Sequence, residues 1–246
     1  MLCIDINCDM GEGFAAEEFI MPFISSANIA CGCHAGDEDM VKQTISLAMQ
    51  HNVAIGAHPG FADKENFGRK EILLSDEGYY HLIKEQLELI RELTDELGAK
   101  MHHVKPHGAL YNMSAKNEKL AYIIAKAVKD FDGELMLYGL SESHSINEAK
   151  KIGLQTASEV FADRTYNDDG ILTLRSFANA LINDDAQCIQ QVLQMIHEKS
   201  VTSVNNKKIA IVAETICIHG DGPHAVEFAK KIYYTLHELN IAIKAK

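Results

Sequence analysis

Short stretches in which apolar and polar residues alternate recur along the chain, and each predicts a strand. The first, residues 3–9, alternates with a period of two and carries Ile4, Ile6 and Cys8 at its apolar positions, as a half-buried strand does. Each stretch ends near glycine, proline or a polar cluster, which are the usual signals of a turn. The other predicted strands lie within residues 22–32, 52–57, 100–105, 134–139, 154–161 and 215–218.

Between these strands the apolar residues recur at helical spacing. The clearest predicted helix covers residues 76–97, where Ser75 can cap the start and Gly98 can end the last turn. We interpret its apolar stripe as core packing. Further helices are predicted over residues 38–51, 116–130, 145–152 and 184–199, and from Pro223 to about Leu239, with a small hairpin that pairs residues 202–204 with 209–212.

Strands that alternate with helices predict a parallel sheet covered by helices. Seven such units favour a distorted, incomplete seven-stranded β/α barrel of the TIM-barrel type over an open sheet. The 246 residues contain no linker-like stretch, so we expect residues 1–246 to form a single domain.

The composition of the chain argues against some classes of function and location. The net charge of −12 argues against a nucleic-acid partner, because binding phosphate requires a basic face. The chain has no apolar run of membrane-spanning length and no signal-peptide pattern at its start. We therefore expect no membrane segment and a cytoplasmic location, where the six cysteines would be free thiols. Cys31 and Cys33 are separated by one residue, which is too close for the usual zinc spacing.

Polar residues follow six of the seven predicted strands. In a β/α barrel the carboxyl ends of the strands meet at one edge, the mouth, so these side chains are expected to share one pocket. Asp37 also has a simpler interpretation as a helix cap, and Asp221 as a turn residue. The full set, in chain order, is Asn7, Asp9 and Glu12, then His34 and Asp37, then His58, then Lys105 and His107, then Glu159, Asp163 and Arg164, and finally His219 and Asp221.

Carboxylates, imidazoles and a cation in one mouth suit the hydrolysis of an amide or ester. A carboxylate or histidine takes a proton from water, and a cation stabilises the oxyanion that develops. A metal site is an alternative use, since Asp9, His34 and His58 are a sensible ligand set that leaves a position for water. No local histidine spacing decides between them. The Gly-x-x-x-x-Gly-Lys, Gly-x-Gly-x-x-Gly and Gly-x-Ser-x-Gly motifs are absent, which argues against an ordinary ATPase, dehydrogenase or serine hydrolase.

Six segments, taken together and in order, resemble the LamB/YcsF family. They include Asp-Ile-Asn-Cys-Asp-Met-Gly-Glu-Gly at residues 5–13 and His-Val-Lys-Pro-His-Gly-Ala-Leu-Tyr-Asn at residues 103–112. The others lie at residues 26–37, 56–60, 161–166 and 218–221. The resemblance implies a distorted seven-stranded barrel related to deacetylase and glycoside hydrolase barrels.

The resemblance also implies an activity. It is the ATP-dependent opening of 5-oxo-L-proline (pyroglutamate) to L-glutamate, with ATP (and its Mg²⁺) as co-substrate and two partner subunits, B and C, of a 5-oxoprolinase. A five-membered lactam is a stable amide, and phosphorylation of its oxygen would make the ring carbon electrophilic. The missing nucleotide loop is consistent with partners that help to bind ATP.

On this basis we assign candidate roles. Asp9, Glu12 and His58 are expected to accept a proton or bind a metal, and Lys105 and His107 to contact the substrate carboxylate or the oxyanion. The expected substrate-binding residues are Asn7, His34, Asp37, Glu159, Arg164, His219 and Asp221, with Arg164 on an anion. Two alternatives stay open: a metal-dependent deacetylase or amidohydrolase that needs no ATP, and a non-catalytic subunit that only binds the substrate.

Overall fold

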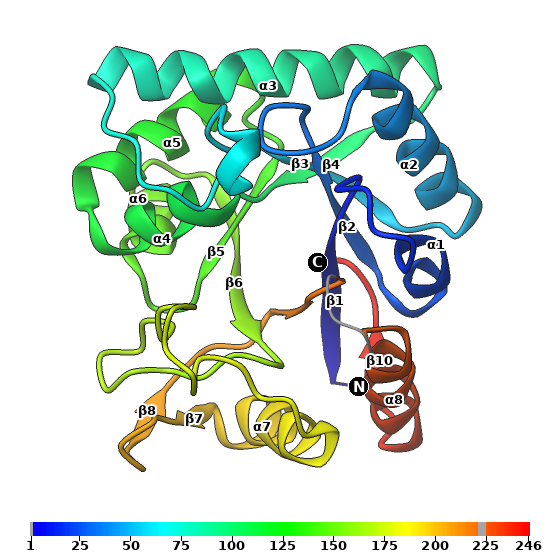
Figure 1. The fold of residues 1–246 in the computed structure, drawn as a ribbon, viewed down its shortest axis with the longest axis vertical. Coiled ribbons are helices and arrows are strands. Elements are labelled where there is room, and N and C mark those ends of the chain that lie inside the picture. Colours follow the sequence, from blue (N-terminus) through cyan, green and yellow to red (C-terminus); the bar gives the residue numbers. More distant parts are fainter. Residues whose placement is uncertain (1, 221–224) are drawn as a thin grey trace.

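Seven parallel strands form a closed barrel in the computed structural model, which describes residues 2–220 and 225–246 (Figure 1). β9 pairs with β6 on one side and with β1 on the other, and this pairing closes the ring. The predicted seven-stranded barrel is therefore confirmed. Around the ring the strands are β1 (Cys3–Met10), β2 (Ser26–Ala30), β3 (Ala54–His58), β4 (Met101–Val104), β5 (Met136–Leu140), β6 (Gln155–Phe161) and β9 (Thr215–Ile218).

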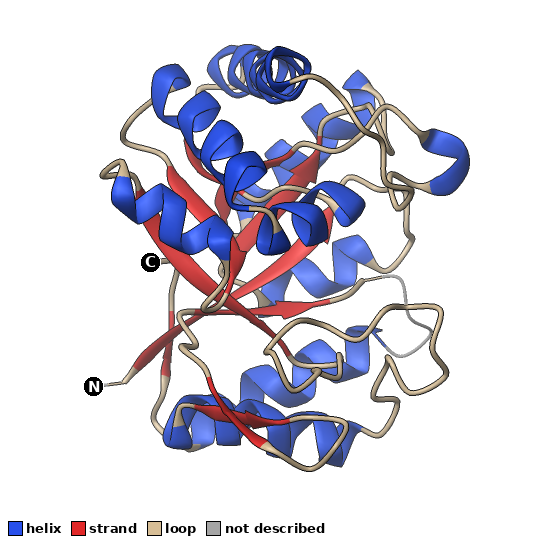
Figure 2. Ribbon diagram, turned by 90° about the vertical axis from the view of Figure 1, so that its left-hand side faces the viewer, coloured by secondary structure: helices blue, strands red, loops and turns tan. Residues whose placement is uncertain are grey.

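Helices cover the outside of the barrel (Figure 2). Ser75 Oγ accepts a hydrogen bond from the Gly78 amide, and Asp37 Oδ1 accepts one from the Met40 amide, so both predicted helix caps are confirmed. The long helices are α2 (Glu38–Gln50), α3 (Asp76–Glu96), α4 (Gly108–Lys116), α5 (Glu118–Phe131), α6 (His144–Lys151), α7 (Asp185–Glu198) and α8 (Ala225–Glu238), and the short ones are α1 (Glu17–Ile20), η1 (Met21–Phe23) and η2 (Lys64–Asn66).

The helix predicted over residues 116–130 is α5, whose limits differ from the prediction by at most two residues. A second helix, α4, was not predicted and precedes it; the two are separated at Asn117, whose side chain accepts from the Leu120 amide and caps α5. The predicted turn at residues 106–108 is the start of α4, with His107 as its N-cap. The predicted start of the last helix, Pro223, lies outside the described residues.

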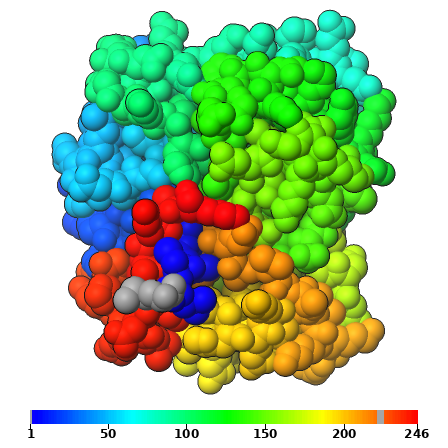
Figure 3. Space-filling view, turned by 180° about the vertical axis from the view of Figure 1, so that it is seen from behind, coloured from blue at the N-terminus to red at the C-terminus, as the bar shows by residue number. Residues whose placement is uncertain are grey.

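Two small strand pairs complete the fold. β7 (Ser200–Thr202) and β8 (Lys208–Ala210) form the predicted antiparallel hairpin, displaced slightly along the chain. β10 (Ala242–Ile243) was not predicted, and it pairs with β1 at Cys3 and Ile4. The two ends of the chain are therefore neighbours (Figure 3), at the end of β1 that is remote from the mouth.

The interior of the barrel is polar, whereas the apolar core lies between the strands and the helices. Thr215 Oγ1 donates to Asp5 Oδ2 at 2.6 Å, and Asn7 Nδ2 donates to Thr215 Oγ1 at 2.7 Å. Asn28 Nδ2 donates to Asn7 Oδ1 at 2.8 Å, and the His103 ring nitrogen lies 2.8 Å from Asn28 Oδ1. These buried groups have partners, as buried polar groups require, and they form a rigid base under the mouth.

Two further expectations concern the whole chain. The six cysteines are all free, as predicted, and four of them are buried. Among the described residues, no helix has both the length and the apolar character that crossing a membrane would need.

Candidate functional site

A cavity of about 180 Å³ opens at the mouth of the barrel. The ends of β1, β3 and β4 contribute carboxylates, imidazoles and one lysine to its lining. The loop that follows β6 contributes Arg164 and Arg175, and the end of β9 contributes His219. The ionisable lining residues are Asp9, Glu12, His58, Arg69, Lys105, His107, Tyr111, Lys116, Arg164, Arg175 and His219.

Lys105 lies at the base of the cavity and is 2% exposed. Its Nζ is 2.9 Å from Asp9 Oδ1 and 2.8 Å from Glu159 Oε1, and it donates to Asn7 Oδ1 at 3.2 Å. Burial alone would lower the pKa of Lys105, but the adjacent anionic groups, Asp9 first, hold it well above its usual value. Lys105 is therefore a fixed cation that neutralises two carboxylates.

Asp9 receives a second set of contacts. Asn28 Nδ2 donates to Asp9 Oδ1 at 2.8 Å, and His58 Nε2 is 3.3 Å from Asp9 Oδ2. Burial alone would raise the pKa of Asp9, but His58 and Lys105 outweigh that effect and hold the pKa well below its usual value. Asp9 is ionised at neutral pH, and Asn28 fixes its orientation.

His58 and His107 each use one ring nitrogen on a backbone carbonyl. His58 Nδ1 is 2.7 Å from the Lys105 oxygen, and His107 Nε2 is 2.8 Å from the Phe67 oxygen. A carbonyl only accepts, so both of these nitrogens carry the proton. The other two nitrogens, His58 Nε2 and His107 Nδ1, then approach each other at 2.9 Å, and two lone pairs at that distance need a proton or a cation between them.

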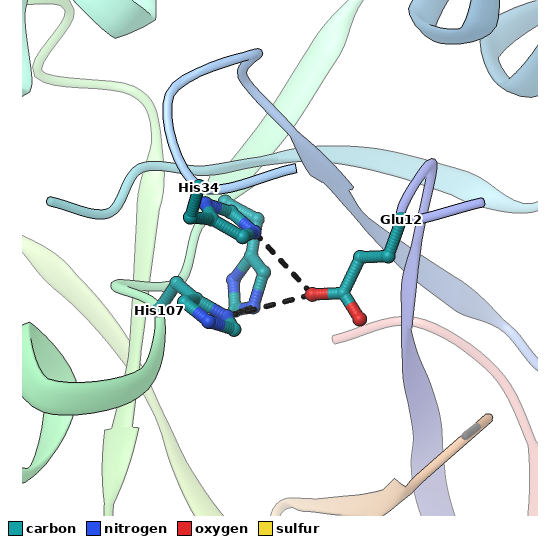
Figure 4. Close-up of side chains that lie close together, drawn as sticks. Glu12, His34 and His107 are labelled. Atoms are coloured by element: carbon teal, nitrogen blue, oxygen red, sulfur yellow. Dashed lines mark hydrogen bonds and ion pairs between the residues drawn. The ribbon is translucent and has the colours of Figure 1, made fainter. Parts of the chain in front are cut away.

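Glu12 and His34 complete the cluster (Figure 4). Glu12 Oε1 lies 3.3 Å from His34 Nε2 and 3.5 Å from His107 Nδ1, with the carboxylate directed at the two rings. The rings of His34 and His107 stack at 3.7 Å between centroids. Burial and the neighbouring imidazoles lower the pKa of His34 and bring the pKa of His107 to about 3. Both rings are neutral at pH 7 and offer lone pairs.

This cluster has the chemistry of a metal centre. Ligand atoms of Glu12, His34, His58 and His107 all lie within 4.8 Å of one another. Imidazole and carboxylate donors suit Zn²⁺ and related divalent ions, and a carbonyl bonded to the second ring nitrogen is the usual way to orient a ligating histidine. The set shares His34 and His58 with the expected one and adds Glu12 and His107, while Asp9 Oδ2 lies 3.3 Å from His58 Nε2.

A second group of side chains lies beyond β6 and β9. His219 Nδ1 is 2.8 Å from Asp163 Oδ1, so the other ring nitrogen of His219 is left for the cavity. Burial alone would raise the pKa of Asp163, but His219 lowers it below its usual value. Asp163 therefore stays ionised and orients the His219 ring through its contact with Nδ1.

Arg164 is buried in the loop after β6. Its guanidinium donates to the Thr173 oxygen at 2.6 Å and to the Ala180 oxygen at 3.3 Å, and so folds that loop over the mouth. Burial, and then the nearby Arg175, lower the pKa of Arg164 to about 10, which leaves it charged. The cations Arg69, Lys116, Arg164 and Arg175, which we call the cationic rim, line the same cavity.

Three of the remaining candidates, Asn7, Asp37 and Glu159, do not line the cavity. Asn7 lies in the barrel interior below Lys105, and Glu159 is fully buried beside Lys105. Asp37 caps α2 and does not line the cavity. Asp221 lies outside the described residues.

Several residues at the site were not predicted. Arg69 follows Phe67-Gly68 in the polar loop after the third strand. The position of that loop, directly after a strand end with a site residue, could have predicted Arg69 as part of the site. Lys116 and Tyr111 lie on α4, where the start of the helix was interpreted as a turn. Asn28 and His103 are inward residues of strands, and the available signal was that both are polar and lie in segments that resemble the family.

The fold and the site define a parallel β/α barrel protein with an imidazole- and carboxylate-rich centre at the carboxyl ends of its strands. The sequence model of the LamB/YcsF family matches residues 4–246. This chain therefore belongs to the LamB/YcsF family, as its motifs indicated.

Relatives match over the full length. The A subunit of the 5-oxoprolinase from Bacillus cereus (strain AH187) is 49% identical over 251 residues, which cover 100% of this chain and 99% of the relative. A lactam utilization protein from Thermus thermophilus, whose crystal structure is known, is 36% identical with a TM-score of 0.92, and the match covers 100% of both chains.

More distant structures share the fold alone. The catalytic domain of a peptidoglycan N-acetylglucosamine deacetylase from Eubacterium rectale gives a TM-score of 0.55 at 10% identity, covering 99% of this chain and 88% of that one. A GH113 β-1,4-mannanase gives a TM-score of 0.50 at 10% identity, covering 96% and 100%. The expected relation to deacetylase and glycoside hydrolase barrels is confirmed at the level of the fold.

Proposed function

We propose that this chain is the A subunit of an ATP-dependent 5-oxoprolinase, which opens 5-oxo-L-proline to L-glutamate and hydrolyses ATP to ADP and phosphate. Full-length relatives that are named as the A subunit of 5-oxoprolinase support this. One structural observation carries it: Asp9, Glu12, His58 and His107 line the same cavity as the cationic rim. The active complex would include two partner subunits, B and C, and work in the cytoplasm, where ATP is available.

The substrate presents a carboxylate and a lactam amide, and the cavity has a group for each. The planar guanidinium of Arg164 suits a carboxylate or a phosphate. The chain has a net charge of −12, so a local cationic rim would concentrate an anionic substrate at the mouth. With its carboxylate on the rim, the lactam would face Asp9 and the histidine cluster.

The bond changes follow from the chemistry of the lactam. Transfer of a phosphoryl group from ATP to the lactam oxygen releases ADP and activates the ring carbon. Water then adds to that carbon and gives a proton to the carboxylate of Asp9, which Lys105 and Asn28 hold in place. The ring C–N bond breaks as protonated His219 gives its proton to the nitrogen, and a second water hydrolyses the resulting acyl phosphate to glutamate and phosphate.

Glu12, His34, His58 and His107 would hold a divalent metal ion in the same mouth. Such an ion supplies a Lewis acid that polarises an amide oxygen and lowers the pKa of a bound water. Lys105 has a supporting role in this scheme, because it is surrounded by acceptors and buried below Asp9 rather than directed at the substrate.

The test is reconstitution of this chain with the two partner subunits, followed by measurement of glutamate and ADP. We expect both products in equal amounts, and none when this chain or ATP is left out. Asp9→Asn should bind 5-oxoproline but not turn over, and Arg164→Lys should raise KM more than it lowers kcat. An unchanged rate without this chain would overturn the proposal, and wild-type turnover by Asp9→Asn would leave this chain only a binding role.

A metal-dependent amidohydrolase that works without ATP is the second candidate. The four convergent ligand atoms favour it, because such a centre can activate water unaided. Elemental analysis and assays of the isolated chain with Zn²⁺ or Mn²⁺ separate the two. Glutamate release from 5-oxoproline by this chain alone, without ATP, would support the second candidate.

A further inference from the structure

The loop that carries Glu12 is folded around the carboxylate of a different residue, Glu17. The Gly11 amide donates to Glu17 Oε2 at 2.7 Å. The amides of Glu12, Gly13 and Phe14 donate to Glu17 Oε1 at 3.0, 3.0 and 3.1 Å. Four successive N–H groups thus converge on one buried anion, which is the geometry of an anion-binding nest.

The backbone of this loop has little freedom. Gly11 and Gly13 have φ values of +70° and +91°, in the region that favours glycine, and Glu12 lies between them. On the outer side, a Cβ at Gly36 would come within 2.6 Å of the Gly11 oxygen, so a neighbouring loop packs closely here. Glu17 holds the loop from within while Gly36 confines it from outside.

We propose that Glu17 is a positioning residue, which fixes the backbone at residues 11–14 so that the carboxylate of Glu12 reaches His34 and His107. This rests on the proposed role of Glu12 at the site. Hydrogen bonds to an ionised acceptor are about twice as strong as neutral ones. Without that anion, the four amides lose their acceptor. The backbone at residues 11–14 is then no longer fixed in the conformation that directs Glu12 at the imidazoles.

A double-mutant cycle tests this. The variants are Glu12→Gln, Glu17→Gln and the two together, with the exposed neighbour Glu18→Gln as matched control. The readouts are the Kd of the full chain for Co²⁺ and the kcat and KM of the reconstituted complex. We expect Glu17→Gln to weaken Co²⁺ binding by about 10–100-fold, the usual effect of losing a support behind a metal ligand, and to lower kcat with KM unchanged.

The double variant distinguishes a role through Glu12 from a purely structural role of Glu17. If Glu17 acts through Glu12, adding Glu17→Gln to Glu12→Gln causes no further loss in Kd or kcat. A purely structural role predicts instead that the two losses multiply. Multiplying losses, or wild-type values for Glu17→Gln, would overturn the proposal, and so would equal losses in Glu18→Gln.

Failure of the proposed function would look different. If the wild-type complex releases no glutamate, the function fails, but the Co²⁺ cycle still decides the role of Glu17. If Glu12→Gln keeps wild-type Co²⁺ affinity, Glu12 is not a ligand, and the cycle is decided on kcat.

A second pair of variants tests the proposal without substituting Glu17, so that the test still works if Glu17→Gln does not fold. Gly13→Ala and Gly98→Ala both place a side chain at positive φ, +91° and +70°, and a Cβ at either position has room. Both therefore carry similar backbone strain, but only Gly13 adjoins Glu12. We expect Gly13→Ala to reproduce the loss of Co²⁺ affinity and Gly98→Ala to retain wild-type affinity, and equal affinities in the two variants would contradict the proposal.

Discussion

The buried ammonium of Lys105 links the chemistry of the mouth to the stability of the barrel. Two carboxylates, Asp9 and Glu159, lie within 2.9 Å of its Nζ, and Glu159 is inaccessible to solvent. Removing one partner of a buried ion pair leaves an uncompensated charge, whereas replacing both partners removes it. The same cation also holds Asp9 ionised.

Substitution of Lys105 should therefore unfold the protein more easily as well as inactivate it. Lys105→Met is expected to lower the free energy of unfolding by about 3–5 kcal/mol, because it removes the lysine that pairs with the buried Glu159 and leaves Asp9 with only Asn28 and His58. Urea unfolding followed by circular dichroism measures the loss. Adding Glu159→Gln should restore a large part of the stability but no activity, and a double variant as unstable as Lys105→Met would contradict this account.

Single residues also show how far the sequence could predict the site. Asp9 and His58 lie at the ends of strands, and Lys105 and His107 follow one, so the parallel barrel alone brings them to one mouth. Glu17 carries no such signal, since its four bonds depend on a loop whose two glycines have positive φ. The partners of Lys105 depend on which inward residues face each other across the barrel, and that requires the strand register.

At the scale of elements, strands β3 and β4 fit together because Gly56 has no side chain. A Cβ on Gly56 would lie 2.1 Å from His103 Nε2, and the two residues are partners in the register of the strands. The His103 ring fills this space, stacks on Tyr138 at 4.1 Å between centroids, and contacts Asn28, which in turn orients Asp9.

Gly56→Ala is accordingly expected to affect both stability and activity. Overpacking should cost about 1–3 kcal/mol or more, and the displaced ring should release Asn28 and lower kcat. Gly133→Ala is the matched control, since a Cβ there meets only the Lys129 oxygen at 3.8 Å. Thermal unfolding and the reconstituted assay check both variants, and a Gly56→Ala protein with wild-type Tm and kcat would refute the packing argument.

Elements differed in how well their sequence predicted them. The helix α3 has a cap, a stop and a long apolar stripe, and its observed limits, Asp76–Glu96, agree with the prediction to within one residue. The start of α4 was missed because Pro106-His107-Gly108 also fits a turn, and only packing against Gly68, whose oxygen accepts from the Ala109 amide, shows otherwise. β10 is two residues long, too short for a periodic pattern.

For the whole molecule, the two ends of the chain stabilise the barrel at the side away from the site. The Ala242 amide donates to the Leu2 oxygen at 2.9 Å, and the Lys244 amide donates to the Ile4 oxygen at 3.0 Å. Ile241 is 4% exposed and packs in the core. These contacts are remote from the mouth.

Removal of residues 240–246 should therefore lower the stability of the barrel and leave the binding of Co²⁺ at the mouth unchanged. Loss of Ile241 burial alone should cost about 1.5–3 kcal/mol, which calorimetry would detect as a lower Tm. The Kd for Co²⁺, measured well below that Tm, should stay at the wild-type value. A truncated chain that keeps its Tm, or that loses Co²⁺ affinity while folded, would show that this division is wrong.

Buried thiols make the stability of the whole barrel sensitive to alkaline pH. Burial raises the pKa of Cys188 from 9.0 to about 12, so the folded state holds this proton more tightly than the unfolded state. The stability it contributes is complete below pH 9 and falls as the pH rises towards 12, by about 1.4 kcal/mol per pH unit. Between pH 9 and 10.5, the free energy of unfolding of Cys188→Ala, measured by urea unfolding, should fall less steeply with pH than that of the wild type. The difference in slope should be about 1.4 kcal/mol per pH unit. Val192→Ala, buried on the same helix, should be less stable at every pH with the wild-type slope, and parallel curves for all three proteins would contradict the assignment.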